Sequence, residues 1–427
     1  MNSVFKAAAI LLPAENVPLQ TWATLACDQF TSQPDYWQAA AALCQNVPST
    51  LHLTLPEVYL ADADVAARID IIHKTMRSYA ENVLTKTVSG FVYVARKTQS
   101  GVRQGLVGAV DLEAYSYEKG AAPLVRPSEN TVVERIPPRL AVRRDALLET
   151  PHILMLLDDA AHAIIEPIGA QTEKLTQIYD TDLMLGGGHI TGWAVTDAAQ
   201  IAAIEAQIMA SAAQNVFDAR YPAAAGKPPI ALAVGDGNHS LATAKAYWEE
   251  IKPSLSPAQR AQHPARYALA ELVNVHSDAI AIEPIHRAVF GTDFAAFSDA
   301  FAAWLTQNKA ELCDKNSAEQ CFTLLGTAEK SLAIASPPRP LAVGTLEAFL
   351  GSFCAENPAV SVDYIHGEDA LRAICRDKNA IGILLPPFAK SDLFRGVVLG
   401  GVLPKKTFSM GSATEKRYYL ECRKIAL

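Results

Sequence analysis

The feature that most constrains this chain is a short apolar segment near its middle that ends in a cluster of polar residues and glycines. Residues 229–234 (PIALAV) lead into 235–240 (GDGNHS) and then into 241–250 (LATAKAYWEE). The apolar run is too short for a helix and is bounded by prolines and glycines, so it predicts a buried strand. The third segment predicts a helix over 241–251. Unpaired amide N–H groups at the start of such a helix favour an anion.

The polar cluster has a functional and a structural interpretation. Asp236 and His239 are candidates for holding an anion at the helix start. The structural alternative is a satisfied turn in which Gly235 and Gly237 adopt positive φ. Ser240 has its own alternative, since a serine at this place can cap the helix. The sequence therefore predicts an anion site here and leaves the role of Ser240 open.

Several ordered blocks along the chain resemble DUF1015, a largely uncharacterised prokaryotic family. The strand and turn at 229–240 also resemble the Asp-Gly-His-His-Arg element of the ParB and sulfiredoxin-like superfamily, which includes archaeal free-serine kinases. The blocks that carry the wider resemblance are 26–32 (ACDQFTS), 126–131 (RPSENT), 235–244 (GDGNHSLATA), 284–287 (PIHR) and 404–408 (PKKTF).

This resemblance implies catalytic roles for three residues. In the serine kinases, a glutamate upstream acts as the base on the substrate hydroxyl, and the Asp-Gly-His-His-Arg turn holds the nucleotide phosphates. By that likeness Glu129 is the base, and Asp236 and His239 lie on the phosphate side, with Asp236 as a ligand of Mg²⁺. The implied cofactors are a nucleotide, ATP or ADP, and Mg²⁺. Ser240 stands where the family has arginine, so a neutral hydroxyl replaces a charged guanidinium.

The same blocks supply candidates for binding substrate or phosphate. Arg126 could pair with a carboxylate or a phosphate, His286 and Arg287 could close the site, and Lys406 could replace part of the missing arginine's charge. The alternative for 286–287 is a hydrogen-bonding corner. The segment 125–139 is predicted to be an ordered loop. The alternative for the arginines near 135–144 is a solvated connector. Lys405, Lys416 and Arg417 are interpreted as solvated side chains. The full set of binding candidates is Arg126, Asn238, Ser240, His286, Arg287 and Lys406.

Two further motifs are of second rank. The triple glycine at 186–188 is neither a Walker loop nor a dinucleotide fingerprint. It indicates either a close backbone approach to a ligand, with His189 beside it, or a flexible turn. Cys27 is a weak candidate for a thiol nucleophile, since no sequence rule pairs it with a histidine. The chain lacks a His-Glu-x-x-His motif and a Cys-x-x-Cys pair, so structural zinc is not expected.

Composition limits the classes of partner. The net charge of −8 disfavours a surface for polyanions, so a ParB-like role on DNA is not expected and no nucleic acid partner is predicted. The seven cysteines show no paired spacing and indicate reduced thiols in the cytoplasm. No apolar stretch reaches the ~18 to 20 residues that a membrane span needs. A small-molecule substrate is the predicted partner, and the sequence does not determine an oligomeric state.

The predicted fold is α+β, with a mixed-sheet ParB/sulfiredoxin-like core and a smaller C-terminal α/β domain. A chain of 427 residues with 50% hydrophobic residues can bury more than one core. We place the nucleotide-binding domain at 1–290 and the C-terminal domain, which completes the site, at 291–427. The predicted helices are 34–44, 61–84, 197–214, 241–251, 294–308, 346–355 and 368–376. The predicted strands are 1–13, 90–97, 106–111, 152–157, 190–195, 229–234, 321–325, 331–336, 361–365, 380–385 and 418–423.

The function predicted from these features is nucleotide-dependent phosphotransfer to a small hydroxylated metabolite, with free serine as the favoured acceptor. The alternatives are a nucleotide-binding regulatory protein without turnover and a structural or interaction protein. Neither composition nor spacing identifies the phosphoryl donor or the acceptor.

Overall fold

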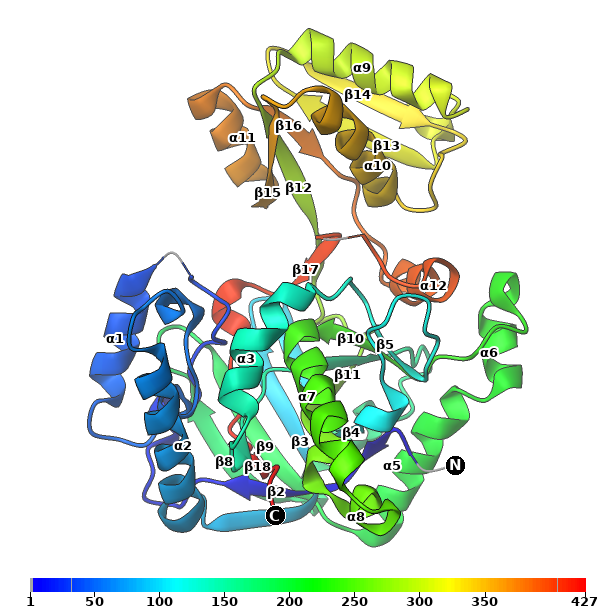
Figure 1. The fold of residues 1–427 in the computed structure, drawn as a ribbon. Coiled ribbons are helices and arrows are strands. Elements are labelled where there is room, and N and C mark those ends of the chain that lie inside the picture. The colour runs from blue at the N-terminus through cyan, green and yellow to red at the C-terminus, as the bar shows by residue number, and fades with distance from the viewer. Residues whose placement is uncertain (1–2, 32, 405) are drawn as a thin grey trace. The chain divides into compact units, whose positions relative to one another are not determined.

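The computed structural model describes residues 3–31, 33–404 and 406–427, so Ser32 and Lys405 of the sequence blocks lie outside it. The chain forms two compact units (Figure 1). Unit 1 comprises Met1–Ala281 and Gly411–Leu427, and unit 2 comprises Ile282–Met410. Unit 2 thus begins at Ile282, ahead of the predicted boundary at residue 290, because a single strand runs unbroken from Ile282 to Phe290 and belongs to unit 2. The C-terminal segment returns to unit 1, which the sequence did not indicate.

Unit 1 is built on a mixed sheet in the order β5-β10-β7-β11-β4-β3-β9-β8, with β1 on β4 and β2 on β3. The strands are β1 Phe5–Lys6, β2 Ala8–Leu12, β3 Lys86–Thr98, β4 Gly101–Asp111, β5 Val125–Pro127, β7 Leu154–Leu157, β8 Thr176–Asp182, β9 His189–Val195, β10 Leu232–Asp236 and β11 Tyr267–Asn274. A separate pair joins β6 Leu148–Glu149 to β18 Arg423–Lys424. The β5–β10 and β7–β11 pairs are parallel, and the other pairings in the sheet are antiparallel.

The sheet is buried on both faces, which explains its near-continuous apolar strands. On β4, Leu106 and Val110 pack into one hydrophobic cluster, whereas Val107 packs into another. Side chains that alternate along a strand point to opposite faces, so the two clusters are the two sides of the sheet. Trp248, from helix α7 (Asn238–Ile251), belongs to the first cluster, and Met76, from helix α2 (Val65–Asn82), belongs to the second.

Helices of unit 1 cover these faces, and Figure 1 shows α3 and α7 side by side over the sheet. They are α1 Pro34–Cys44, α2 Val65–Asn82, α3 Ile136–Arg143, α4 Glu166–Gly169, α5 Ala198–Ser211, α6 Gln214–Arg220, α7 Asn238–Ile251 and α8 Pro257–Gln262. Helix α3 replaces part of the loop predicted over 125–139. Its prolines stand in the first turn, where the missing amide hydrogens cost nothing.

Unit 2 has a sheet in the order β14-β13-β16-β12-β15, with β17 paired to β12. All of its pairings between described strands are antiparallel. Unit 2 therefore contains the predicted helices and strands but not the parallel strand–helix–strand units of an α/β domain. Its strands are β12 Ile282–Phe290, β13 Gln320–Leu325, β14 Glu329–Ile334, β15 Ser361–His366, β16 Ile381–Leu384 and β17 Phe408–Met410. Its helices are α9 Phe294–Gln307, α10 Ala342–Glu356, α11 Glu368–Lys378 and α12 Lys390–Gly400.

Most predicted elements occur within a few residues of their expected bounds, and the predicted mixture of helices with a large mixed sheet is confirmed. The strand predicted over 418–423 is an exception, because regular pairing there begins with β18, at Arg423. All seven cysteines are free thiols. Among the described residues, none of the helices combines the length and the apolar character needed to cross a bilayer.

Candidate functional site

The candidate site lies where neighbouring strands of unit 1 end together. The parallel register pairs Val234 of β10 with Pro127 of β5. Because the carboxyl ends of parallel neighbours meet at one edge of a sheet, Glu129 and Asp236 leave the sheet beside each other. Strand β7 runs antiparallel and pairs Leu154 with Asp236, so His152 reaches the same edge just before β7 begins.

A glycine turn connects Asp236 to α7. Gly237 has φ 78° and ψ 25°, in the left-handed region, and a Cβ there would lie 2.2 Å from the carbonyl oxygen of His152. Glycine is therefore required both by conformation and by space. Gly235, by contrast, belongs to β10 and does not adopt the positive φ of the structural alternative. Within the described chain no side chain caps α7 at Gly237, and Ser240 is the third residue of the helix, so the capping alternative for Ser240 is wrong.

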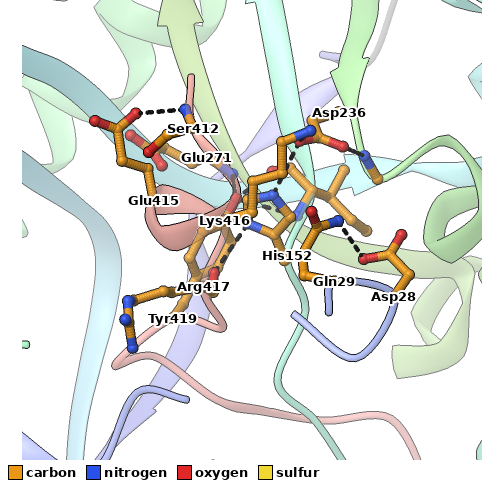
Figure 2. A network of polar contacts seen from close by, with 12 residues as sticks. Asp28, Gln29, His152, Asp236, Glu271, Ser412, Glu415, Lys416, Arg417 and Tyr419 are labelled. Carbon is orange, nitrogen blue, oxygen red and sulfur yellow. Dashed lines mark hydrogen bonds and ion pairs between the residues drawn. The ribbon is translucent and has the colours of Figure 1, made fainter. Parts of the chain in front are cut away.

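Asp236 is held between two basic side chains (Figure 2). Its Oδ2 lies 3.0 Å from Lys416 Nζ and 3.3 Å from His152 Nε2, and its Oδ1 accepts a 2.7 Å hydrogen bond from Gly237 N–H. Burial by itself would raise the pKa of Asp236. The charge of Lys416 and the hydrogen bond from His152 outweigh burial and hold the pKa of Asp236 well below its ordinary value. Asp236 is therefore an anion throughout the neutral range.

His152 faces an acceptor with each ring nitrogen. Nδ1 lies 2.9 Å from the carbonyl oxygen of Arg417, while Nε2 faces the Asp236 carboxylate. A carbonyl oxygen and a carboxylate can only accept, so both contacts are satisfied when both nitrogens carry a proton. His152 therefore bridges the Arg417 backbone and the Asp236 carboxylate.

Lys416 is brought to the site by the returning C-terminal segment. Its carbonyl oxygen accepts a 2.8 Å hydrogen bond from Ala26 N–H, and Tyr418 N–H donates to Thr24 over 2.9 Å. The Arg417 guanidinium donates to the carbonyl oxygens of Thr414, Ala23 and Leu185. The interpretation of Lys416 and Arg417 as solvated side chains is wrong, since Arg417 is 1% exposed and the Lys416 side chain 18%.

Lys416 also links Asp236 to the loop after β5. Burial lowers the pKa of Lys416, but the charge of Asp236 and its hydrogen bond raise it, and the charges of Asp28 and Glu129 add to the rise, so that the net shift is upward. Such charge effects act over short distances in a partly buried site. The Asp236 carboxylate therefore contacts the Lys416 ammonium group, and the negative charge of Glu129 also acts on that group.

His239 and Asn238 complete the turn. Val132 N–H donates to His239 Nε2 over 3.2 Å, so this nitrogen is unprotonated and ties the loop after β5 to the start of α7. The Oδ1 atom of Asn238 is buried and has no hydrogen-bond partner among the described residues. A buried amide oxygen without a donor is costly, and it marks a place for a donor or a cation.

Arg126 contacts backbone carbonyl oxygens. Its guanidinium donates to the carbonyl oxygens of Pro123, Pro228 and Pro229 at 2.9, 2.7 and 3.0 Å, and the side chain is buried. These contacts use Nε and Nη2 of the guanidinium. They favour a structural role in which Arg126 joins the segments that lead into β5 and β10.

The unit 2 candidates make internal contacts. Leu385 N–H donates to His286 Nδ1 over 3.2 Å, and the fully buried Arg287 pairs with Glu347 at 2.8 Å. Arg287 also lies over the Tyr364 ring and donates to the carbonyl oxygen of Lys406. These contacts favour the hydrogen-bonding corner. The Lys406 side chain is exposed, and a contribution of these residues to the site of unit 1 stays a prediction.

The second-rank motifs have structural explanations. Burial raises the pKa of Cys27 to about 12, so its thiol is not an activated nucleophile. Gly187 leaves the space that the Arg417 guanidinium occupies, since a Cβ there would lie 2.2 Å from Arg417 Nε. The close approach is thus to Arg417 rather than to a ligand. His189 is held by Asp180 and Asp182 at 2.7 and 2.8 Å.

Sequence reasoning missed His152 and misread Lys416. His152 follows Thr150-Pro151 and precedes an apolar strand, which is a weak signal for a site. Neither residue is near Asp236 in sequence, so no spacing rule connects them. Among the described residues, no cluster of three or more histidine, cysteine, aspartate or glutamate side chains is arranged to hold a metal.

Comparison with known proteins finds a family match and several distant structures. No curated protein sequence matches the chain. A conserved hypothetical protein from Pyrococcus furiosus is similar with TM-score 0.36 and 11% identity, over 74% of this chain and 94% of that one. A free serine kinase in complex with AMP has TM-score 0.38 and 11% identity, over 75% and 91%. SbnI with a C-terminal truncation, from Staphylococcus aureus, has TM-score 0.36 and 9% identity, over 71% and 82%.

At these scores the structural likeness does not extend to function. The sequence itself matches a family: residues 7–353 fit the profile of the family described as protein of unknown function (DUF1015). This range covers most of the chain, and the chain belongs to the DUF1015 family.

Proposed function

We propose that unit 1 binds a nucleotide at the start of α7 and transfers a phosphoryl group to a small hydroxylated metabolite. The observation that carries this proposal is the pairing of Lys416 with Asp236 beside an uncapped helix N-terminus, next to the strand that leads to Glu129. Phosphoryl transfer depends mainly on positioning and on stabilising negative charge. A lysine ammonium group, a histidine ring and a helix N-terminus supply that stabilisation in one place.

In this proposal the phosphates lie at the first turn of α7. The amide N–H groups there have no intrahelical acceptors, and Gly237 leaves them without a side-chain cap. Lys416 would pair with a phosphate oxygen, while His152 keeps Asp236 in place through its 3.3 Å contact. The absence of a guanidinium at Ser240 makes Lys416 the main cation for the phosphates.

Asp236 and Asn238 fit a Mg²⁺ ion carried by the nucleotide. Mg²⁺ prefers oxygen ligands and usually keeps several waters, so one or two protein oxygens suffice. Asp236 Oδ1 accepts the Gly237 amide and, as a carboxylate oxygen, has a second lone pair. The buried Asn238 Oδ1 has no partner in the described chain. When bound, the ion would neutralise charge on the phosphates.

Glu129 takes the role of base toward the acceptor hydroxyl in this proposal. It leaves the sheet beside Asp236, and its charge acts on the same lysine. Free serine is the first acceptor to test, as the resemblance to the ParB and sulfiredoxin-like free-serine kinases implies. The ParB/sulfiredoxin-like description of the core is part of the same proposal.

A nucleotide-binding regulatory protein without turnover is the second candidate. It is favoured by the shortage of cations, because Ser240 is neutral and the Arg126 guanidinium is used by carbonyl oxygens. Binding needs fewer charges than stabilisation of a transition state.

The test is calorimetric binding of ATP and ADP with and without Mg²⁺, followed by an assay of transfer to serine, threonine and homoserine. Asp236→Asn should weaken nucleotide binding, whereas Glu250→Gln, at the far end of the same helix, should not. Absence of nucleotide binding would exclude both candidates. Binding without transfer to any acceptor would leave the regulatory one.

A further inference from the structure

Unit 1 contains a cavity of about 130 Å³ whose walls are largely apolar. It lies between the segment before α2, the helices α2 and α3, and the residues that surround β6. The apolar lining residues are Leu53, Leu55, Leu60, Met76, Pro138, Val142, Ala146, Leu148, Pro151 and Ile153. The nucleotide and base roles proposed above do not involve this cavity.

The cavity shares its walls with the candidate site. Ser240 and Thr243 line it from the first turns of α7, directly after Asp236. Tyr418 lines it two residues beyond Lys416, and Cys27 lines it one residue before Asp28. The cavity therefore adjoins the turn where the phosphates are proposed to lie.

The charged groups on its walls are already paired. Arg139 contacts Glu57 and lies 3.9 Å from Asp28, and Arg143 pairs with Glu149 at 2.7 Å. Burial would raise the pKa of Glu149, but Arg423 and Arg143 outweigh it and keep the carboxylate ionised. The ion pairs neutralise these charges, so the wall favours a neutral occupant over a charged one, although Glu57 Oε1 and Arg143 Nε have no hydrogen-bond partner among the described residues.

Hydroxyl groups line the wall at α7 and at Tyr418, and also at Thr54 and Thr150. Thr243 donates its hydroxyl to the carbonyl oxygen of His239 over 2.7 Å, and Tyr418 accepts from Cys27 N–H over 3.3 Å. Ser240 is a further hydroxyl on this wall. A ligand would thus place a polar end toward α7 and an apolar end toward Leu53, Leu60 and Met76.

The volume sets the size of the apolar part. A cavity of about 150 Å³ lined by aliphatic and aromatic side chains accommodates benzene. The space in unit 1 is slightly smaller, which suits a branched or cyclic hydrocarbon of up to about six non-hydrogen atoms.

We propose that this cavity binds the apolar body of the acceptor, so that the acceptor is a hydroxylated molecule with a branched or cyclic hydrocarbon group. This inference rests on the proposed phosphotransfer. It places the acceptor hydroxyl at the α7 end, beside Ser240 and toward Asp236. It also means that serine, which has no such body, leaves most of the cavity unfilled and is a poorer acceptor than a bulkier amino alcohol.

The test uses the full chain and three amino alcohols of increasing apolar size: alaninol, valinol and leucinol. Calorimetry should show affinity that rises about fourfold for each added CH₂ group. Transfer of phosphate, measured with ATP and Mg²⁺, should rise in the same order. Equal affinity along the series would overturn the proposal.

Two substitutions at one partly exposed wall residue provide the matched control. Leu60→Trp fills the cavity and should weaken leucinol binding at least about tenfold, whereas Leu60→Ala enlarges it and should shift preference toward phenylalaninol. Val142→Phe is a second filling variant on α3, for use if Leu60→Trp does not fold. Unchanged leucinol binding in a folded filling variant would contradict the proposal.

The result separates the two proposals. ADP binding without any response to the amino alcohols would overturn the cavity assignment and leave the proposed function in place. Leucinol binding in a protein that fails to bind ADP with Mg²⁺ would overturn the proposed function instead, and with it the role of the cavity as an acceptor site.

Discussion

In unit 1, a polar cluster lies at each of the two sides of the sheet where strands end. The two clusters differ in the helix that follows these strands in the chain. At one end, the carboxyl ends of β5 and β10 lead to Glu129 and Asp236. At the other end, the carboxyl ends of β7 and β11, which run parallel to each other and opposite to β10, lead to Asp158 and His276. Both clusters contain a histidine in contact with an aspartate.

Most groups of the second cluster pair with one another, although Glu166 Oε2 has no hydrogen-bond partner among the described residues. His276 Nε2 lies 2.6 Å from Asp158 Oδ1, and Tyr221 donates its hydroxyl to the same carboxylate. Asn274 donates to Glu166 over 2.9 Å. The helix that succeeds β7 is α4, which spans only four residues. These contacts hold loops together, and the short helix offers no set of free amides.

The first cluster combines the same chemistry with a long helix. Asp236 is followed by Gly237 and then by the 14 residues of α7, which lack a side-chain cap within the described chain. Lys416 adds a lysine ammonium. A histidine–carboxylate pair by itself is therefore a poor guide to a site, and an uncapped helix beside a mostly buried lysine is a better one.

The largest expected effect concerns the proposed base. Glu129→Gln should lower turnover about 10²- to 10⁴-fold while leaving nucleotide affinity nearly unchanged, because a base acts mainly in the transition state. Glu166→Gln, at the second cluster, should leave turnover within about twofold of the unmodified protein. Steady-state kinetics and calorimetry measure both. Equal losses in the two variants would remove the distinction between the clusters.

Asp236→Asn should destabilise the fold by about 3 kcal/mol, because Lys416 and His152 lose the carboxylate that pairs with them in a mostly buried place. It should also weaken binding of ADP with Mg²⁺. Asp158→Asn should cost about 1 kcal/mol and leave ADP binding intact, since it alters hydrogen bonds outside the site. Urea denaturation and calorimetry give the two quantities. Loss of ADP binding in the Asp158 variant would contradict the comparison.

Gly237→Ala tests whether the turn needs glycine for space as well as for conformation. The control is Gly226→Ala, because Gly226 has almost the same φ, 79° against 78°, but nothing within 4 Å of an added Cβ among the described residues. Gly226→Ala should cost about 1 kcal/mol of unfolding free energy. Gly237→Ala should cost at least about 1 kcal/mol more, because the methyl group meets the His152 carbonyl. Equal losses in denaturation experiments would mean that the turn relaxes freely.

The smallest effect concerns a third histidine–carboxylate group, at the β8–β9 hairpin. The hydrogen bond to Asp182 raises the pKa of His189, against a smaller opposing effect of burial, and Asp180 raises it further. Because the folded pKa lies above the ordinary value of 6.5, the stabilisation is complete below pH 6.5 and disappears as pH rises through the folded pKa. The group is exposed, so only a few tenths of a kcal/mol are expected.

Titration of His189 by NMR in the unmodified protein and in Asp182→Asn measures this shift. The pKa of His189 should fall in the variant, and the melting temperature at pH 5 should fall slightly more than at pH 8. A pKa of His189 that does not respond to Asp182→Asn would show that the hairpin contact is absent in solution.

Local patterns predicted the strand, turn and helix around Asp236 well. The apolar run ends at the turn, and β10 and α7 differ from the predicted 229–234 and 241–251 by only a few residues. The pattern at 125–139 is less informative. Its prolines favour a loop when read alone, but at the first turn of α3 they are compatible with a helix.

The sequence by itself determined the residue types at the candidate site and the elements that carry Asp236, because hydrophobic period and glycine placement act over a few neighbouring residues. Only the tertiary structure decided which distant segments meet there. His152 is 84 residues from Asp236, and Lys416 arrives from beyond the whole of unit 2. Hydrophobic periodicity predicts which face of a helix or strand a side chain occupies. The docking of remote segments depends on how those faces pack against one another, which no local pattern encodes.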